Sequence, residues 1–160
     1  MAISIGEKIP NATVMVATKD GPEKTETVQL LGSGTVALFS VPGAFTPTCS
    51  AKHLPGFVEK AAALKAKGVD KIVCMSVNDA FVMQAWGEAQ SAGGDVVMMA
   101  DGNADFANAL GLAFDAKDFG MGQRSQRFSA VLNGGVVEKL NVEEGGAFEV
   151  SSAEYMLEQL

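Results

Sequence analysis

Short apolar runs that alternate with helix-patterned segments are the feature that most restricts the fold of this chain. Residues 35–41 (TVALFSV) form an apolar, β-rich run that ends at a Pro-Gly turn, and residues 71–77 (KIVCMSV) form a second one. The segment between them, residues 47–67, has helical spacing, although Pro55-Gly56 inside it predicts a kink or two separate helices. Strands joined by helices are typical of a layered α/β domain.

The rest of the chain continues this alternation. The expected elements are a helix that Asn78 or Asp79 caps and that ends near Gln90, a strand over 95–100, a helix over 103–110 and strands over 127–132 and 136–140. Asn133-Gly134-Gly135 between the last two strands is a strong hairpin signal. A final helix is expected from Ser151, with Glu154 completing a capping box. We therefore predict a single α/β domain over residues 1–160.

Size and charge exclude several classes of protein. The chain has 160 residues and a formal net charge of -7, which disfavours nucleic acid as a partner because phosphate backbones attract clustered Lys and Arg. No apolar run approaches the roughly 20 residues that span a membrane. The start, MAISIGEKIP, has no secretory signal pattern, so we expect a cytoplasmic protein, or an organellar one if a transit peptide has been removed.

The segment PGAFTPTC, residues 42–49, is the strongest candidate for chemistry. It follows the first apolar strand, with Thr46 at an N-cap position, Pro47 in the first helical turn and Cys49 within that turn. Backbone N–H groups and the helix dipole there favour a negative charge, and such thiols have pKa values lowered from about 8.5 to roughly 3.5–7.5. The alternative is that Cys49 is a small apolar residue packed under a loop.

Several segments carry a resemblance to a known family. They are VPGAFTPTCSAKHLPGF (41–57), SVNDAFVMQAW (76–86), ADG (100–102), RSQRFS (124–129) and NVEEGGAFEVSSAE (141–154). Together they cover nearly the whole chain, which resembles the atypical type II peroxiredoxins, the group that includes peroxiredoxin-5. The resemblance implies a thioredoxin-like fold, with a central mixed β-sheet flanked by helices, and thiol peroxidase activity without a cofactor or metal.

The same resemblance implies roles for individual residues. Cys49 would be the nucleophile that attacks a hydroperoxide and becomes a sulfenic acid. Thr46 would place its hydroxyl against the sulfur and the peroxide, and Pro42 would shield the thiolate from water. Arg127 would hold the thiolate and polarise the O–O bond, a task that suits the rigid, permanently charged guanidinium. Arg124 competes with Arg127 for this role.

The second cysteine, Cys74, lies in the middle of an expected strand. If strands 35–41 and 71–77 are parallel neighbours, Cys49 lies beyond the end of that pair, and a direct disulfide would require local unfolding. We therefore expect Cys74 to be structural, with a regulatory or slow resolving role as the alternative. Some type II members carry a C-terminal resolving cysteine, and GGAFEVSS here contains none. A one-cysteine cycle follows, with glutathione and glutaredoxin favoured over thioredoxin as reductant, in a protein that the resemblance implies is a homodimer.

Other interpretations compete with this one. His53, four residues after Cys49, could pair with it as a general base or bind a metal, but no further ligands stand at zinc-like spacing, so we expect a structural hydrogen-bonding residue. A redox-sensing protein that signals through oxidised Cys49 is the main functional alternative. A general disulfide oxidoreductase is disfavoured because the chain has no Cys-x-x-Cys pair.

Overall fold

The computed structural model describes the whole chain apart from the side chain of Cys49. The strands are β1 (Thr13–Thr18), β2 (Gly21–Glu26), β3 (Thr35–Ser40), β4 (Lys71–Ser76), β5 (Val97–Ala100), β6 (Ala113–Asp115), β7 (Gln123–Ser125), β8 (Phe128–Asn133) and β9 (Val136–Val142). The helices are α1 (Thr27–Leu31), the π-helical turn η1 (Cys49–His53), α2 (Leu54–Glu59), α3 (Ala61–Ala66), α4 (Ala80–Ala89), α5 (Asp105–Leu110), the short 3₁₀ turn η2 (Lys117–Phe119) and α6 (Ala153–Gln159).

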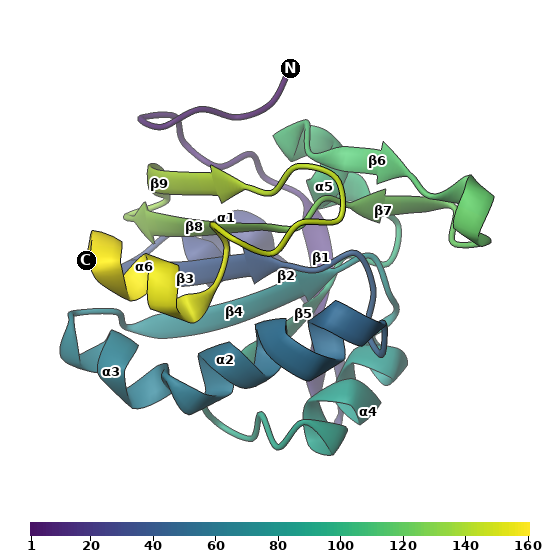
Figure 1. Ribbon diagram of the computed structural model, residues 1–160, viewed down its shortest axis with the longest axis horizontal. Coiled ribbons are helices and arrows are strands. Elements are labelled where there is room, and N and C mark those ends of the chain that lie inside the picture. The colour runs from purple at the N-terminus through teal and green to yellow at the C-terminus, as the bar shows by residue number, and fades with distance from the viewer.

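A seven-stranded mixed sheet forms the centre of the molecule, in the order β2-β1-β5-β4-β3-β8-β9 (Figure 1). Strands β3, β4 and β5 are mutually parallel, and the neighbours on both sides run antiparallel. Strands β6 and β7 form a separate two-stranded ribbon. This architecture confirms the predicted mixed sheet flanked by helices.

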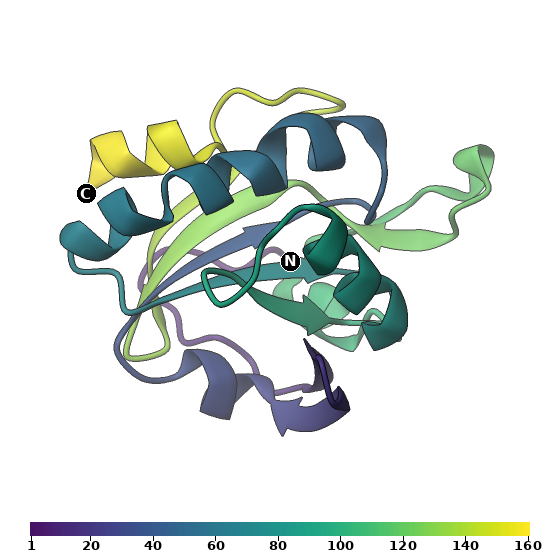
Figure 2. The same ribbon diagram turned by 90° about the horizontal axis from the view of Figure 1, so that it is seen from below.

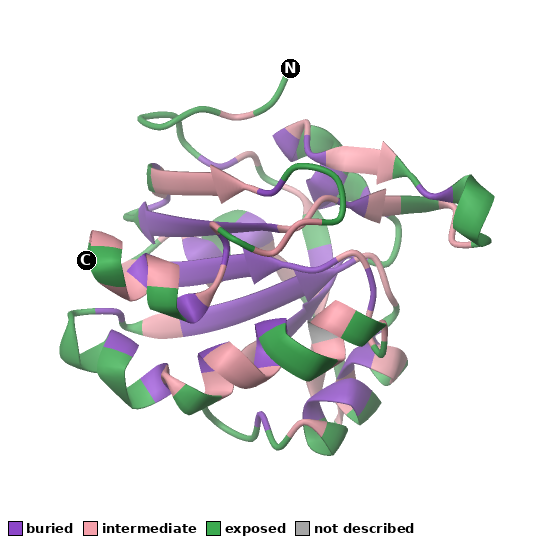
Figure 3. Cartoon of the chain, in the orientation of Figure 1, coloured by how far each residue is buried: buried purple, intermediate pink, exposed green. Residues whose placement is uncertain are grey.

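Helices cover both faces of the sheet, as Figure 2 shows for α2, α3 and α6 on one side and α1 on the other. Helices α2, α3, α4 and α6 bury their apolar side chains against one face, where Phe39, Phe57 and Trp86 are fully enclosed. Helices α1 and α5 cover the other face, around Phe106 and Phe128. The central strands are buried on both sides in consequence (Figure 3), which explains why their sequences are continuously apolar.

The two edge strands of the sheet differ from the centre. Strand β2 is largely exposed and contains Pro22 and several charged residues. Along β9, the N-terminal segment runs beside the edge, with Gly6 N donating to Val137 O and Val137 N donating to Glu7 O. A segment without regular structure thereby continues the hydrogen-bond ladder for a short distance.

Several predicted local features are confirmed. Strands β3 and β4 are parallel, with Phe39 opposite Cys74. Asp79 caps α4, accepting a hydrogen bond from Val82 N at 2.8 Å. Gly134 and Gly135 form the hairpin loop with φ values of 59° and 81°, a left-handed region in which glycine is unstrained.

The predicted division of the helical segment 47–67 is confirmed, and one prediction about a helix boundary is wrong. The π-helical turn η1 gives way to α2 one residue before Pro55, which lies in the first turn of α2, where a missing N–H costs little, and α2 and α3 are separated at Lys60. The last helix is capped by Ser152, which accepts from Tyr155 N, and not by Ser151. The Ser151 hydroxyl has another partner, the Glu143 carboxylate.

The described part of the chain contains no helix long and apolar enough to cross a bilayer.

Candidate active site

The loop after β3 leaves the sheet at the end where parallel strands β3 and β4 both finish. Thr46 Oγ1 donates to the Gly43 carbonyl at 2.7 Å, and Ala44 N donates to Asn78 Oδ1 at 2.9 Å. Phe45 between them has a φ of 65°, a left-handed conformation that is uncommon for a residue with a side chain. These contacts fix a tight turn that delivers Thr46 to the start of the following helix.

Cys49 is the first residue of η1, and the predicted role of its thiol lies outside the described residues. Its neighbour Ser50 is held from two sides: Ser50 N donates to Thr46 O at 2.9 Å, and Trp86 Nε1 donates to Ser50 Oγ at 2.9 Å. Trp86 is fully buried in α4. The backbone that carries Cys49 is thus tied both to the preceding loop and to the core.

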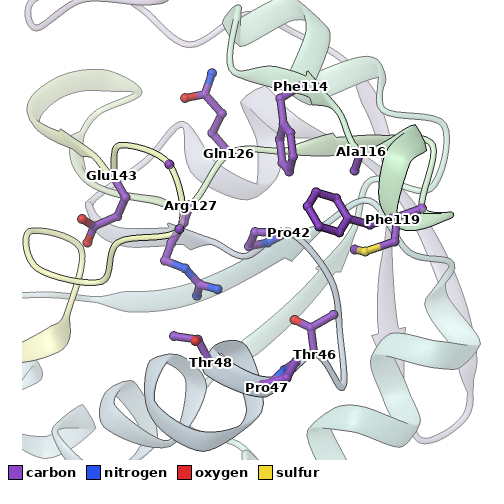
Figure 4. Close-up of a pocket in the computed structure, with 13 residues that line it drawn as sticks. Pro42, Thr46, Pro47, Thr48, Phe114, Ala116, Phe119, Gln126, Arg127 and Glu143 are labelled. Carbon is purple, nitrogen blue, oxygen red and sulfur yellow. The ribbon is translucent and has the colours of Figure 1, made fainter.

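Arg127 lies directly before β8, and its side chain crosses to the same region. Its Nη1 donates to His53 Nδ1 at 2.9 Å, and the guanidinium lies 5.8 Å from the centroid of the Phe148 ring. Figure 4 shows the guanidinium pointing toward the start of the helix, where Thr46 and Thr48 lie. A positive charge is therefore held close to the turn that carries Cys49.

His53 is fully buried and makes a hydrogen bond with each ring nitrogen. The Ser151 carbonyl oxygen, 2.9 Å from Nε2, can only accept, so Nε2 carries the proton and Nδ1 accepts from Arg127. Burial and then the charge of Arg127 lower the pKa of His53 to about 3, and the Ser151 contact offsets them only in part. A neutral imidazole with a hydrogen bond at each ring nitrogen fits the predicted structural hydrogen-bonding role. Among the described residues, no three His, Cys, Asp or Glu side chains are grouped as a metal site.

Glu143 directly follows β9, and no role in the site was predicted for it from the sequence. Its Oε2 accepts from the backbone N–H groups of Glu149, Val150 and Ser151, each at 2.8 Å, and from Ser151 Oγ at 2.6 Å. Burial acts to raise the pKa of Glu143, but the hydrogen bonds from Ser151 and the backbone outweigh it and hold the pKa below its ordinary value. Glu143 is therefore a carboxylate that organises the loop before α6.

A pocket of about 730 Å³ opens between these elements (Figure 4). Its lining includes all three non-cysteine residues predicted for the site, Pro42, Thr46 and Arg127. Phe114, Phe119 and Met121 supply an apolar wall from the β6–β7 ribbon and its connection. The pocket thus combines one polar, cationic side with one apolar side.

Arg124 has a different environment from Arg127. Its Nε donates to the Met121 carbonyl at 2.9 Å, and its Nη1 donates to the Pro42 carbonyl at 3.4 Å. The structure therefore brings Arg127 into the lining of the pocket and uses Arg124 to support the backbone behind Pro42.

Cys74 is fully buried in the middle of β4. It lies opposite Phe39, whereas the chain must still leave β3 and pass through the whole loop to reach Cys49. This placement agrees with the strand pairing from which we predicted a structural role for Cys74.

Sequence reasoning gave no part in the site to Glu143 and Phe148, and it assigned Ser151 to the start of a helix instead. The signal available was weak: a glutamate after a strand, followed by Gly145-Gly146, is typical of any exposed turn. Only the folded chain shows that the carboxylate points back into its own loop.

The fold and the pocket define a class that comparison with known proteins confirms. The model of the redoxin family matches residues 4–157, and the chain belongs to this family. Within it, the chain is a type II peroxiredoxin with a thioredoxin-like fold. It is 55% identical to rice peroxiredoxin-2E-2, chloroplastic, over 163 residues that cover 99% of this chain and 72% of the relative.

Solved structures agree. Reduced Prx3 from Vibrio vulnificus, in complex with H2O2, is 52% identical, has a TM-score of 0.94 and is covered to 98%, as is this chain. A Burkholderia cenocepacia structure provisionally described as a thioredoxin reductase is 47% identical, with a TM-score of 0.98 and coverage of 100% of this chain and 99% of that one. Since this chain has only two cysteines, 25 positions apart at 49 and 74, it lacks the dithiol pair expected for disulfide reduction. The family supports thiol peroxidase activity.

Proposed function

We propose that the chain reduces hydrogen peroxide and small alkyl hydroperoxides with Cys49 as its nucleophile. The Cys49 thiolate attacks one peroxide oxygen, the O–O bond breaks, and the departing oxygen takes a proton to leave as water or an alcohol. The sulfur is thereby oxidised to a sulfenic acid. Two external thiols return it to the thiol, the first displacing water to form a mixed disulfide and the second releasing that disulfide.

The observation that carries this proposal is the convergence of Pro42, Thr46 and Arg127 on one pocket beside the turn that Cys49 begins. Pro42 and Thr46 come from the loop after β3, and Arg127, more than 80 residues later, reaches the same pocket from the start of β8. Charge moves from sulfur to the departing oxygen during the reaction, so a fixed guanidinium and a fixed hydroxyl along that path lower the barrier. We assign Arg127 and Thr46 to this work and Pro42 to excluding water from the sulfur.

His53 keeps the Arg127 charge available for that work. Because the imidazole is neutral and accepts from Arg127, it orients the guanidinium and leaves its positive charge in place. A carboxylate partner would instead neutralise that charge. The apolar wall formed by Phe114, Phe119 and Met121 suits the alkyl group of a small organic hydroperoxide.

We infer a one-cysteine cycle with an external reductant, glutathione and glutaredoxin being favoured and thioredoxin the alternative. The support is the burial of Cys74 within β4 and the lack of any cysteine after it in the sequence. We propose further that residues 1–160 act as one domain and pair as a homodimer. Phe119 and Phe45 beside the pocket, 79% and 54% exposed, would be suited to such an interface. The protein would be cytoplasmic, or organellar like the relatives described as chloroplastic.

The test is peroxide consumption by wild type, Cys49→Ser and Cys74→Ser, with glutathione plus glutaredoxin and separately with thioredoxin. We expect turnover to vanish only in Cys49→Ser and to be faster with glutaredoxin. Equal loss in Cys74→Ser would mean that both thiols cycle. Rapid oxidation of Cys49 without turnover on any donor would instead favour a redox sensor.

A further inference from the structure

One short segment, residues 148–151, contacts Arg127 directly through the Phe148 ring and indirectly through His53. The Phe148 ring lies against the Arg127 guanidinium and also against the His53 imidazole, with ring centroids 5.0 Å apart for the latter pair. The Ser151 carbonyl accepts from His53 Nε2 at 2.9 Å. The segment therefore supports both the aromatic ring and the imidazole that contact the Arg127 guanidinium.

Residues 148–151 belong to the connection between β9 and α6, which has no regular secondary structure. Three consecutive backbone N–H groups of the connection, those of residues 149–151, instead converge on one oxygen of Glu143, and the Ser151 hydroxyl joins them. Glu143 is only 6% exposed, so these bonds are shielded from water. Hydrogen bonds to an ionised carboxylate are about twice as strong as those between neutral groups.

Glu143 is also tied to Arg127 through the backbone. Its N–H donates to the Arg127 carbonyl at 2.9 Å, continuing the pairing of β8 with β9. The same residue thus fixes the backbone of Arg127 and, through its side chain, the segment that contacts the Arg127 guanidinium.

From these contacts we propose that Glu143 is a positioning residue for the peroxide reaction. Its carboxylate fixes residues 149–151, the Ser151 carbonyl then fixes His53, and His53 together with Phe148 directs Arg127 toward the pocket. Glu143 lines the pocket, but its carboxylate oxygen is directed to the N–H groups of the loop and not toward Thr46 or Arg127 (Figure 4). This inference rests on the proposed function of Cys49 and Arg127.

The decisive variant is Glu143→Gln, which keeps the size of the side chain but replaces the charged acceptor with a neutral amide. Some hydrogen bonds to the loop can persist, but they are weaker. Displacing a reacting group by about 1 Å can lower a rate by about a hundredfold, so we expect a fall of roughly ten- to a hundredfold in the rate of Cys49 oxidation by hydrogen peroxide. The matched control is Glu144→Gln, because Glu144 is the exposed neighbour and its side chain lies outside this contact chain.

The experiment measures single-turnover oxidation of Cys49, by rapid quenching with an alkylating reagent and mass analysis, in Glu143→Gln, Glu144→Gln, Arg127→Gln and the Glu143→Gln/Arg127→Gln double variant. If Glu143 acts through Arg127, its substitution lowers the rate in wild type and has less than about a twofold effect in the Arg127→Gln background. The pH at which Cys49 alkylation reaches half its maximal rate should rise in Glu143→Gln and in Arg127→Gln. It should stay unchanged in Glu144→Gln.

Two results would overturn the proposal: an unchanged rate in Glu143→Gln, or losses that multiply in the double variant. If Glu143→Gln does not fold, Ser151→Ala, which removes only the hydroxyl donor to Glu143, takes its place with a smaller loss that should also disappear in the Arg127→Gln background. Failure of the proposed function looks different, since Cys49→Ser would then consume peroxide as fast as wild type.

Discussion

Arg124 and Arg127 are half-buried beside the same pocket and only two residues separate them, yet their surroundings differ in kind. Arg124 donates to two backbone carbonyls, those of Met121 and Pro42. Arg127 donates to a neutral imidazole and lies against an aromatic ring. The first arginine supports the loop from behind, and the second lines the pocket itself.

The two arginines are the same residue type, so the difference between them comes from the groups that accept their hydrogen bonds. Carbonyl oxygens of a tight loop draw the Arg124 guanidinium onto the backbone, where its charge serves local structure. Burial lowers the pKa of His53 to about 3, so the imidazole that accepts from Arg127 is neutral at pH 7 and adds no charge of its own beside the guanidinium.

Replacing Arg127 with Gln should lower the second-order rate of the reaction with hydrogen peroxide by about a hundred- to a thousandfold, the usual cost of removing one fixed donor from a developing charge. Stopped-flow measurement at neutral pH gives the rate. Arg124→Gln is the matched control, and we expect it to stay within tenfold of wild type. Equal losses in the two variants would erase the difference between the arginines.

The free energy of unfolding should depend on pH through His53, the hydrogen-bond partner of Arg127. The pKa of His53 is lowered on folding, from 6.5 to about 3, so the unfolded chain binds the proton more readily between these values. Folding stability is therefore lost as the pH falls below 6.5, by up to about 1.4 kcal/mol for each pH unit. Urea unfolding of wild type between pH 7 and pH 5 measures the slope.

His53→Gln is the control for that slope, since glutamine does not titrate. Its free energy of unfolding should depend less steeply on pH than that of wild type. A slope that is the same in both proteins would show that His53 is not held neutral by the fold.

Arg124→Gln should act mainly on stability, because both of its acceptors are backbone atoms of the pocket loops. Loss of a charged hydrogen bond at a half-exposed position costs about 1 kcal/mol of the free energy of unfolding. Urea titration at pH 7 measures it, with Arg127→Gln alongside. A larger loss of stability in Arg127→Gln than in Arg124→Gln would contradict the view that Arg124 supports the structure and Arg127 serves the pocket.

The smallest effect is expected at Ser129, which lies in β8 two residues after Arg127. Its hydroxyl is buried and has no hydrogen-bond partner among the described residues. Ser129→Ala removes an unsatisfied polar group, so the free energy of unfolding should change by less than about 1 kcal/mol or increase, and the peroxide rate should stay at the wild-type value. A large loss of activity in Ser129→Ala would show that the peroxide rate depends on β8 next to Arg127, and not only on the residues that contact the Arg127 side chain.

Much of the central fold could be predicted because its strands are apolar on both faces and its hairpin is marked by Gly134-Gly135. The β1–β2 hairpin and the β6–β7 ribbon were missed. Strand β2 is polar and largely exposed, and β6 and β7 have three residues each, so neither carries a periodic apolar pattern.

The site divides in the same way. Pro42, Thr46 and Arg127 were predicted from the resemblance and lie together around one pocket, although their roles in the reaction stay predictions. The supporting contacts were not predictable, because Glu143 meets its loop through backbone N–H groups, which leave no trace in the residue types of 149–151. The Ser151–Glu154 capping box failed for a related reason: the Ser151 hydroxyl was already bonded to Glu143.

The edges of the central sheet have a consequence for the protein in concentrated solution. An uncovered edge strand is a template onto which another chain can add, and such addition leads to swapped oligomers and fibrils. Here Pro22 removes one donor from the β2 edge and Lys24 and Glu23 beside it discourage a partner, whereas the N-terminal segment occupies part of the β9 edge. Both edges of the central sheet thus offer little backbone for a second copy of the chain to extend.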